Sequence, residues 1–302
     1  RNKCEVKMKI LVTGGAGFVG TNIIKRLLRE NHEVISVDNY SSGFKENHQE
    51  GCNYIDYDIS SHHTNGIYVD HSTYPSWRDE EFDLIFHMAA LARIQPSIKN
   101  PITTINNNFN STLNILEWAR QKNTPVVFAG SSSKHHGLWG SPYAWSKFGG
   151  EQLCELYNKV YNLPTAVCRF YNVYGKHQIE NGTYATVIGI FEKQFREGKA
   201  LTVVGNGQQR RDFTHIDDIV DGIIKCGQNI DKVSGEVFEL GRGQNHSILE
   251  ITEMFGETEV EYISARPGEY DVTLADYSKA KELLNWKPTL NLRDYISGVI
   301  SK

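Results

Sequence analysis

The segment that decides the fold is KILVTGGAGFVGTNIIKRLLRE, residues 9–30. Its apolar start predicts a buried β-strand, and its amphipathic second half predicts an α-helix. Between them, Gly14, Gly17 and Gly20 recur at every third position. Glycine permits a tight turn and close backbone approach, and the free N–H groups at a helix start attract an anion. The segment therefore predicts a phosphate-binding unit of strand, turn and helix.

An acidic residue at the end of the next strand specifies the ligand. Asp38 closes the apolar segment HEVISVD, 24 residues after Gly14. A carboxylate there can accept hydrogen bonds from both ribose hydroxyls of NAD, and it repels the 2′-phosphate of NADP. Asp58 can hold the adenine amine, with a plain turn carboxylate as the alternative, and Ala89 and Ala90 can form a wall of the site or simply core. The other residues expected around NAD are Phe18, Val19, Asn39, Ile59, Tyr143 and Lys147.

Short apolar runs alternate with helical stretches as far as about residue 170. This alternation predicts βαβ units and a parallel sheet with helices on both faces. We therefore expect an α/β protein with a Rossmann-type, doubly wound sheet in residues 1–171, to which segments of about 208–245 return. Residues 172–302 are expected to form a smaller, discontinuous, mixed α/β substrate lobe, and residues 60–80 an irregular loop.

The composition excludes several classes of function. Among 302 residues, 32 basic and 36 acidic side chains leave a net charge of −4, so no basic field favours nucleic acid. The uncharged run 10–24 is too short to span a membrane. Five cysteines without a CxxC pair predict reduced thiols and a cytoplasmic location. No metal site is expected, because His135 and His136 have no partner ligands near them in the sequence and are expected to line a pocket or lie exposed.

Catalytic residues are expected in YAWSK, where Tyr143 and Lys147 share one face of a predicted helix. A tyrosine hydroxyl, with a pKa of about 10, acts as a base near neutral pH only beside a cation that stabilises the phenolate. Lys147 and oxidised nicotinamide can supply that charge. Ser131, Ser132 and Ser133 follow the apolar run VVFAG, at the sheet edge where doubly wound folds bind ligands. A hydroxyl there can bond the reacting oxygen.

At these residues the chain resembles the extended short-chain dehydrogenase/reductases, in particular the nucleotide-sugar epimerase and dehydratase group and its UDP-hexose 4-epimerases. The resemblance runs from Lys9 to about Pro288. The blocks that carry it are TGGAGFVG at 13–20, VDN at 37–39, HMAA at 87–90, NNFNST at 107–112, GSSS at 130–133, YAWSK at 143–147, RFYNVYG at 169–175, RRDFTHIDD at 210–218 and ARPGE at 265–269.

The resemblance favours epimerisation over elimination. Dehydratases of the group carry Thr-Asp-Glu and decarboxylases Thr-Ser-Glu where this chain has Ser132-Ser133-Lys134. Elimination needs a positioned carboxylic acid, which lysine does not readily replace. In an epimerase the tyrosine takes the C4 hydroxyl proton, a hydride passes to NAD, and the 4-keto sugar turns over before the hydride returns. Ser132 is expected to assist Tyr143, because it stands five residues before Gly137, the register of the family.

The resemblance also implies the substrate site. Asn172 would bond the diphosphate or hexose, Arg211 and Arg266 would neutralise phosphate oxygens, and structural salt bridges are the alternative for both arginines. Thr273 stands where related enzymes gate the C2 substituent, so UDP-GlcNAc and UDP-GalNAc are expected to interconvert beside UDP-Glc and UDP-Gal. The alternative for Thr273 is a strand residue whose side chain lies elsewhere. A homodimer is expected. UDP-glucuronate 4-epimerase, another 4-keto-sugar isomerase or reductase, and an NAD-binding regulatory protein remain alternatives. The other residues expected to contact substrate are Ser132, Ser133, Tyr184, Ala185 and Val187.

Overall fold

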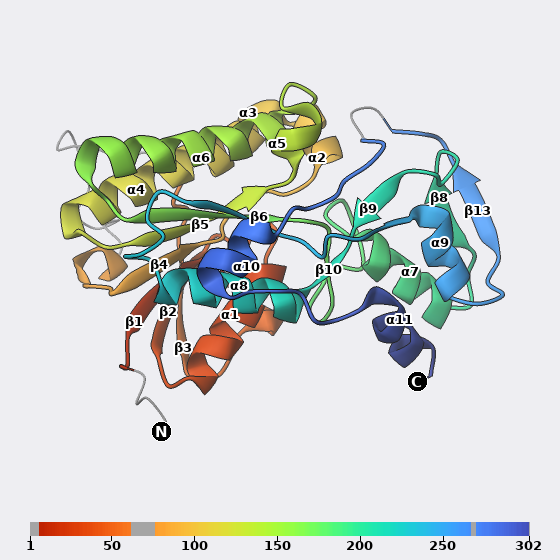
Figure 1. Cartoon of the computed structure of the whole chain (residues 1–302), viewed down its shortest axis with the longest axis horizontal. Helices are drawn as coiled ribbons and strands as arrows, with labels where there is room; N and C mark the ends of the chain where they lie inside the picture. The colour runs from red at the N-terminus through yellow and green to blue at the C-terminus, as the bar shows by residue number, and fades with distance from the viewer. Residues whose placement is uncertain (1–5, 62–75, 267–269, 302) are drawn as a thin grey trace.

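The structure, a computed structural model, describes residues 6–61, 76–266 and 270–301 (Figure 1). Most of the expected irregular loop at 60–80 lies outside these residues. Its described end forms the 3₁₀ turn η3 (Ser76–Asp79), whose Trp77 is buried between Tyr57 and Trp118. Within the described ranges, no helix has the length and apolar character that a membrane crossing requires.

A seven-stranded, fully parallel sheet forms the centre of the larger lobe. Its strand order is β11-β6-β5-β4-β1-β2-β3, which confirms the doubly wound, Rossmann-type arrangement. The order reverses beside β1, so the loops after β1 and β4 separate there and leave room for a ligand. The strands are β1 (Lys9–Thr13), β2 (Glu33–Asp38), β3 (Cys52–Asp56), β4 (Leu84–His87), β5 (Val126–Ser131), β6 (Thr165–Phe170) and β11 (Val237–Leu240).

Helices cover both faces of the sheet, because alternate residues of its strands point to opposite sides. In β1, Ile10 and Val12 belong to one buried cluster and Leu11 to the other. The first cluster is covered by α1 (Phe18–Arg29), α8 (Ile216–Gln228) and α10 (Ser278–Leu284). The second is covered by α4 (Ser111–Lys122) and α6 (Pro142–Tyr161), with α3 (Pro101–Ile105) against α6 (Figure 1).

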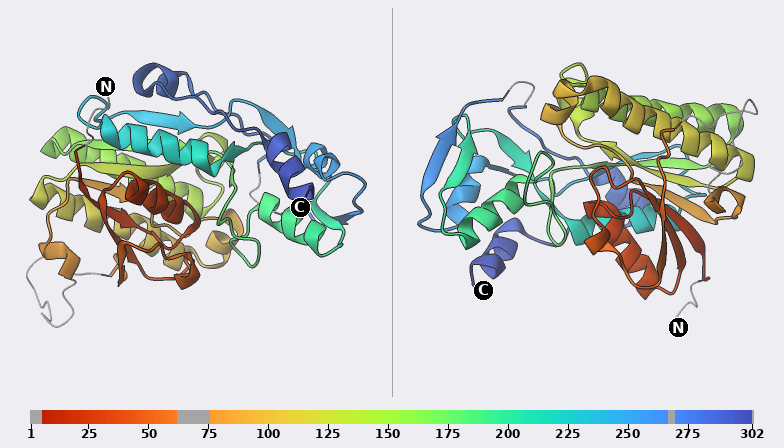
Figure 2. Two further views of the ribbon diagram at one scale, coloured as in Figure 1. Left: turned by 90° about the horizontal axis from the view of Figure 1, so that it is seen from below. Right: turned by 180° about the vertical axis from the view of Figure 1, so that it is seen from behind.

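The smaller lobe lies to one side of the sheet and has a separate apolar core (Figures 1 and 2). Three short strand pairs frame it: β7 (Val173–Tyr174) with β10 (Thr214–His215), β8 (Leu201–Val204) with β13 (Val260–Ile263), and β9 (Arg210–Asp212) with β12 (Asn245–Ser247). Its helices are α7 (Val187–Arg196), α9 (Ile248–Met254) and α11 (Leu292–Ile300).

The chain crosses between the lobes more often than the sequence predicts. β11 and α8 lie in the large lobe, within the segments expected to return there. α10, at residues expected in the substrate lobe, packs against β11 and α8 instead. Trp286 then donates a hydrogen bond to the backbone of Asp218, whose carboxylate accepts from the N–H groups of Thr289 and Leu290. These contacts tie the C-terminal segment to α8.

Candidate active site

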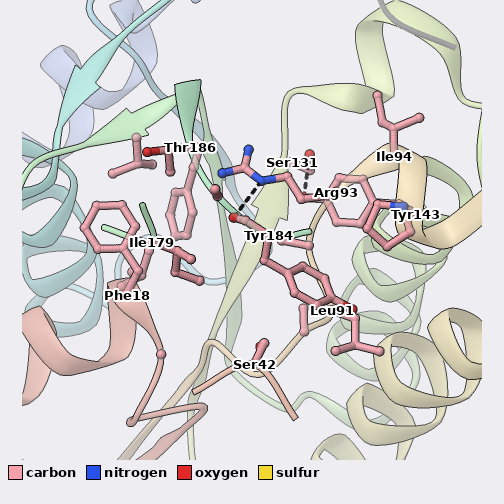
Figure 3. A pocket seen from close by; sticks show the side chains of 18 of the residues that line it. Phe18, Ser42, Leu91, Arg93, Ile94, Ser131, Tyr143, Ile179, Tyr184 and Thr186 are labelled. Atoms are coloured by element: carbon pink, nitrogen blue, oxygen red, sulfur yellow. Dashed lines mark hydrogen bonds between the residues drawn. The ribbon is translucent and has the colours of Figure 1, made fainter. Parts of the chain in front are cut away.

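One cavity of about 510 Å³ lies between the carboxyl ends of the strands and the smaller lobe (Figure 3). This volume is in the range of small-molecule sites. Every residue that the sequence singled out for cofactor or substrate lines it. These are Gly14, Gly17, Phe18, Val19, Gly20, Asp38, Asn39, Asp58, Ile59, Ala89, Ala90, Ser132, Ser133, Tyr143, Lys147, Asn172, Tyr184, Ala185, Val187, Arg211, Arg266 and Thr273.

The glycine turn forms one end of this cavity. Gly14 has φ of 70°, and a Cβ there would lie 2.7 Å from the Cα of Ala89. A Cβ on Gly20 would lie 2.2 Å from the carbonyl oxygen of Gly14. No side chain caps the start of α1, so its first N–H groups remain available to an anion. The bare, uncapped turn fits the diphosphate of a dinucleotide.

Asp38 lies beside the turn, at the end of β2. Its carboxylate accepts hydrogen bonds from the backbone N–H groups of Ala16, at 2.9 Å, and Tyr40, at 2.8 Å. Burial raises the pKa of this carboxyl, while the two N–H groups oppose that shift. Asp38 is 8% exposed, and that exposed part faces the cavity. This carboxylate fits the ribose that the sequence assigns to it.

Tyr143 enters the cavity from the first turn of α6. The Ser141 hydroxyl accepts a hydrogen bond from the N–H of Ala144, and Pro142 occupies the first helical position, so the helix start is fixed. The Tyr143 hydroxyl donates to Oγ of Ser131 at 3.3 Å (Figure 3). A phenol and a serine hydroxyl therefore meet at the carboxyl end of β5.

The serine that contacts Tyr143 differs from the one expected. The family register favoured Ser132, but the structure brings Ser131 to the tyrosine, because β5 extends through Ser131. Ser133 donates to Oγ of Ser131 at 2.9 Å, and Ser132 lines the cavity at the start of α5 (Ser133–Gly137). Because three serines are adjacent in the sequence, the sequence alone does not decide which of them contacts Tyr143.

Burial and nearby charges set the acid–base properties of the pair. Burial raises the pKa of Tyr143, while Ser131 and the guanidinium of Arg93 act in the opposite direction. Burial lowers the pKa of Lys147 to about 8, although the Glu151 carboxylate favours its charged form. The Lys147 ammonium lies 4.4 Å from the centre of the Phe128 ring.

A buried asparagine connects the Tyr143 helix to the loop after β4. Asn108 lies in the π-helical turn η4 (Asn106–Asn110). Its Oδ1 accepts from the N–H of Leu91 at 2.8 Å, and its Nδ2 donates to the Leu91 carbonyl and to Ser146 Oγ. Ser146 in turn donates to the carbonyl of Tyr143. From the sequence, Asn108 is noted only as part of the block NNFNST at 107–112 and is given no role.

Residues of the smaller lobe close the opposite side. The amide of Asn172 donates to Thr273 Oγ1 at 3.3 Å, and Thr273 also accepts from the N–H of Asp212. Thr273 is 2% exposed, and its hydroxyl accepts the hydrogen bond that orients the Asn172 amide. Arg211 and Arg266 line the cavity from neighbouring segments.

The structure also shows where two further residues, His135 and Arg93, lie relative to the cavity. His135 does not line the cavity; its Nε2 contacts Glu239 and lies 3.3 Å from Arg169. Arg93, which the sequence did not single out, enters the cavity from the loop after β4. The available signal was a single cation in the otherwise uncharged stretch 88–98.

Comparison with known proteins identifies the family of the chain. Residues 10–241 match the family described as the NAD dependent epimerase/dehydratase family. The putative UDP-glucose 4-epimerase of Methanocaldococcus jannaschii is 31% identical, with 97% of each chain covered. The UDP-glucuronate 4-epimerase of Thermodesulfobacterium geofontis is 31% identical over 96% of this chain and 94% of its own.

A solved structure shows the same fold. The UDP-glucose 4-epimerase of Thermotoga maritima with UDP-glucose superposes with a TM-score of 0.86 at 26% identity, covering 97% of this chain and 98% of that one. The family match spans well over half of the residues, including the glycine turn, Tyr143 and Lys147. The chain therefore belongs to the NAD-dependent epimerase/dehydratase family, an enzyme family whose cofactor is NAD.

Proposed function

We propose that the protein inverts the configuration at C4 of a UDP-linked sugar. The observation that carries this proposal is the Tyr143 hydroxyl, 3.3 Å from Ser131 Oγ, in the cavity that the glycine turn and Asp38 also line. A phenol–serine pair can hold and deprotonate an alcohol, and the turn fits a dinucleotide. The relatives named above, which are UDP-sugar 4-epimerases by name, support the same reaction.

NAD fits the end of the cavity at α1, where a side chain on Gly14 or Gly20 would collide with backbone. The uncapped N–H groups of α1 would bind its diphosphate, and Asp38 its ribose. When bound there, NAD would supply the hydride acceptor and donor that inversion at C4 requires. Ala89 and Ala90 would line the side of this site formed after β4, and Asp58 and Ile59 the side formed after β3.

Tyr143 would take the proton of the C4 hydroxyl at its Oη and later return it. Ser131 would bind the same oxygen and orient it toward Tyr143. The charge of Lys147 would favour the phenolate, since a cation near a phenol lowers its pKa. Lys134, which replaces the acid of dehydratases, lies with its ammonium 5.3 Å from the Phe148 ring centre and does not line the cavity. Elimination has no acid at that position.

The nucleotide half of the substrate would bind against the smaller lobe. Arg211 and Arg266 would hold the diphosphate, since guanidinium groups match phosphate oxygens in pairs. Asn172, held by Thr273, would bond the sugar or diphosphate, with Tyr184, Ala185 and Val187 beside it. The UDP-Glc/UDP-Gal and UDP-GlcNAc/UDP-GalNAc pairs are the first substrates to test.

The experiment is incubation of the purified protein with single UDP-sugars, without added reductant, followed by NMR of the C4 proton. We expect each productive sugar to reach an equilibrium of two C4 epimers with no net reduction. Loss of water, loss of CO₂ or a one-way reduction would contradict the proposal. So would inertness toward every sugar tested when NAD is bound.

The protein is further proposed to be a homodimer of the cytoplasm. Cys154, Cys168 and Cys226 are buried free thiols, which suits a reducing compartment. Apolar side chains exposed on α3 and α6 support an interface between two copies.

A further inference from the structure

The cavity contains a cation that the proposed reaction does not use. Arg93 follows β4 and directly precedes α2 (Ile94–Lys99). Its Nε donates to the carbonyl oxygen of Tyr184 at 3.2 Å, so the side chain reaches from the large lobe to the smaller one (Figure 3). Of the five N–H donors of a guanidinium, this contact occupies one. Because the Arg93 side chain lines the cavity, its other N–H donors can reach a bound ligand.

No described carboxylate pairs with Arg93. Burial lowers the pKa of its guanidinium, and the Tyr143 phenol opposes that shift. By contrast, Arg169 is bound by Glu151, and Arg210 by Glu250. A cation withdrawn from water is costly unless an anion accompanies it. Among the described residues, the cavity therefore holds a positive charge that no carboxylate neutralises, in the same cavity as the Tyr143 hydroxyl.

The backbone at Arg93 is strained. Its φ of 106° and ψ of 138° lie in a region that side chains rarely adopt. Such strain persists where the surrounding structure holds a residue in place, and it is concentrated at functional sites. Glycine would adopt this conformation at no steric cost. The strain therefore marks Arg93 as a candidate functional residue.

The place of Arg93 limits which anion it can meet. Phosphates already have binding groups in the proposed function: the N–H groups of α1 for NAD, and Arg211 and Arg266 for the sugar diphosphate. Arg93 instead lines the same cavity as Tyr143 (Figure 3), and its charge opposes the rise that burial causes in the pKa of the Tyr143 hydroxyl. If Tyr143 contacts the C4 hydroxyl, the nearest substituents are those on C3 and C5 of the sugar.

We propose that Arg93 binds a carboxylate carried by the sugar ring, so that the preferred substrate is a nucleotide-linked sugar acid. A planar carboxylate matches two N–H donors of a guanidinium. It can be the C6 carboxylate of a uronic acid, attached at C5, or the acid of a carboxyalkyl ether on O3. The proposal rests on the proposed function, because Tyr143 locates C4.

The test compares acidic with neutral substrates. The ratio of kcat/KM for UDP-glucuronate to that for UDP-glucose reports a carboxylate at C6, and UDP-N-acetylmuramate against UDP-GlcNAc reports one on O3. We expect one of these ratios to exceed unity in the wild type. In Arg93→Met it should fall by about 30-fold or more, as when one member of a buried charge pair is removed.

Two further variants test whether the fall comes from backbone strain or misfolding, or from the loss of any nearby positive charge. Arg93→Gly removes the guanidinium and relieves the positive φ, so it should fold and give the same fall in the ratio. Lys99→Met removes an exposed cation from the same short helix and should leave the ratio unchanged. A fall shared equally by acidic and neutral sugars would mean that Arg93 acts on Tyr143 or on a phosphate, and would overturn the proposal.

Binding measurements separate this inference from the reaction. By calorimetry on the NAD-loaded protein, Arg93→Met should weaken the acidic UDP-sugar but leave UDP alone unchanged. Equal weakening of UDP would identify a phosphate as the ligand of Arg93. If no UDP-sugar is epimerised but the acid-specific loss of binding remains, the proposed reaction fails and the carboxylate site stands.

Discussion

Position within the serine run determines which hydroxyl meets Tyr143. Ser131, Ser132 and Ser133 are chemically identical, and their order after β5 decides where each hydroxyl points. Successive residues of a strand face opposite sides, so a shift of one residue changes the partner of Tyr143. Ser131 Oγ lies 3.3 Å from the Tyr143 hydroxyl, whereas the family register predicts that Ser132 assists Tyr143.

The catalytic pair can be tested by single substitutions. We expect Tyr143→Phe to lower kcat by about 10²–10⁴-fold, the usual scale for a proton-transfer group, with NAD content and folding retained. Ser131→Ala should lower kcat more than Ser132→Ala does. Steady-state kinetics on an active UDP-sugar measure both effects. A greater loss in Ser132→Ala would restore the family register.

We propose that Asp38 sets the preference for NAD over NADP. We expect the wild type to bind NAD much more tightly than NADP, because the carboxylate repels a 2′-phosphate. Asp38→Ala should weaken NAD binding and reduce the preference. Calorimetry with both cofactors measures this, with Asp56→Ala as the control, since Asp56 is an exposed carboxylate at the end of β3. Equal affinities in the wild type would refute the assignment.

We propose that Thr273 decides which substituents on C2 of the sugar the cavity accepts. Because threonine is small, we expect the wild type to accept N-acetylated sugars, and Thr273→Tyr to reject them. The hydroxyl of Thr273 also holds Asn172, so Thr273→Val is the matched variant that keeps the volume and removes this hydrogen bond. Comparison of kcat/KM for UDP-GlcNAc and UDP-Glc separates the two effects. If Thr273→Tyr handles both sugars as the wild type does, the gate lies elsewhere.

At the scale of elements, the active site depends on how α6 and the loop after β4 are held together. The π-helical turn η4 carries Asn108, whose amide joins Leu91 to Ser146. On the other side, His87 links Thr13 to Thr112, and Thr112 donates to the Asn108 carbonyl. Burial lowers the pKa of His87 to about 3, so this linker stays neutral. One polar chain thus connects β1 to the helix of Tyr143.

Asn108→Ala tests this chain. It leaves the buried N–H and carbonyl of Leu91 without their partner, which costs about 1–3 kcal/mol for each unsatisfied group. We expect a lower free energy of unfolding in urea and a lower kcat, because Arg93 and Tyr143 lose their common support. Asn106→Ala, at an exposed position of the same turn, should change neither quantity. Wild-type stability in Asn108→Ala would show that the chain is dispensable.

At the scale of the molecule, helices α3 and α6 carry apolar side chains that the described part of the chain leaves exposed. Ile102 of α3 is 75% exposed, and Leu156 and Val160 of α6 are 48% and 58% exposed. Leu156 and Val160 are four residues apart, so they share one face of the helix. Two copies related by a two-fold axis could bury these side chains.

We expect light scattering to report a dimer at micromolar concentration. Val160→Glu should shift the mass toward the monomer, because it would bury a charge in the interface. Val6→Glu, at an exposed apolar residue preceding β1, is the control and should leave the dimer intact. A monomeric wild type would exclude this interface.

The sequence by itself determined the sheet, the glycine turn and the shared face of Tyr143 and Lys147. These depend on apolar periodicity and on spacings within one turn or one helix, which backbone geometry fixes locally. It also identified three groups of residues that line the cavity: the glycine turn, Asp38 and the start of the Tyr143 helix. Each of these lies close after a strand end, where the sequence pattern is clear. It did not fix the lobe to which α10 belongs, since a short amphipathic helix packs on any apolar surface.

Only the tertiary structure decided which groups meet across the cavity. Arg93 contacts a residue 91 positions away, and Asn172 contacts Thr273 across 101 positions. Such contacts depend on how the two lobes pack, which no local spacing encodes. The choice of Ser131 over Ser132 depends likewise on where β5 ends against α6. That no described carboxylate pairs with Arg93 is visible only in the fold, because an arginine in the sequence does not show whether an acid will lie beside it.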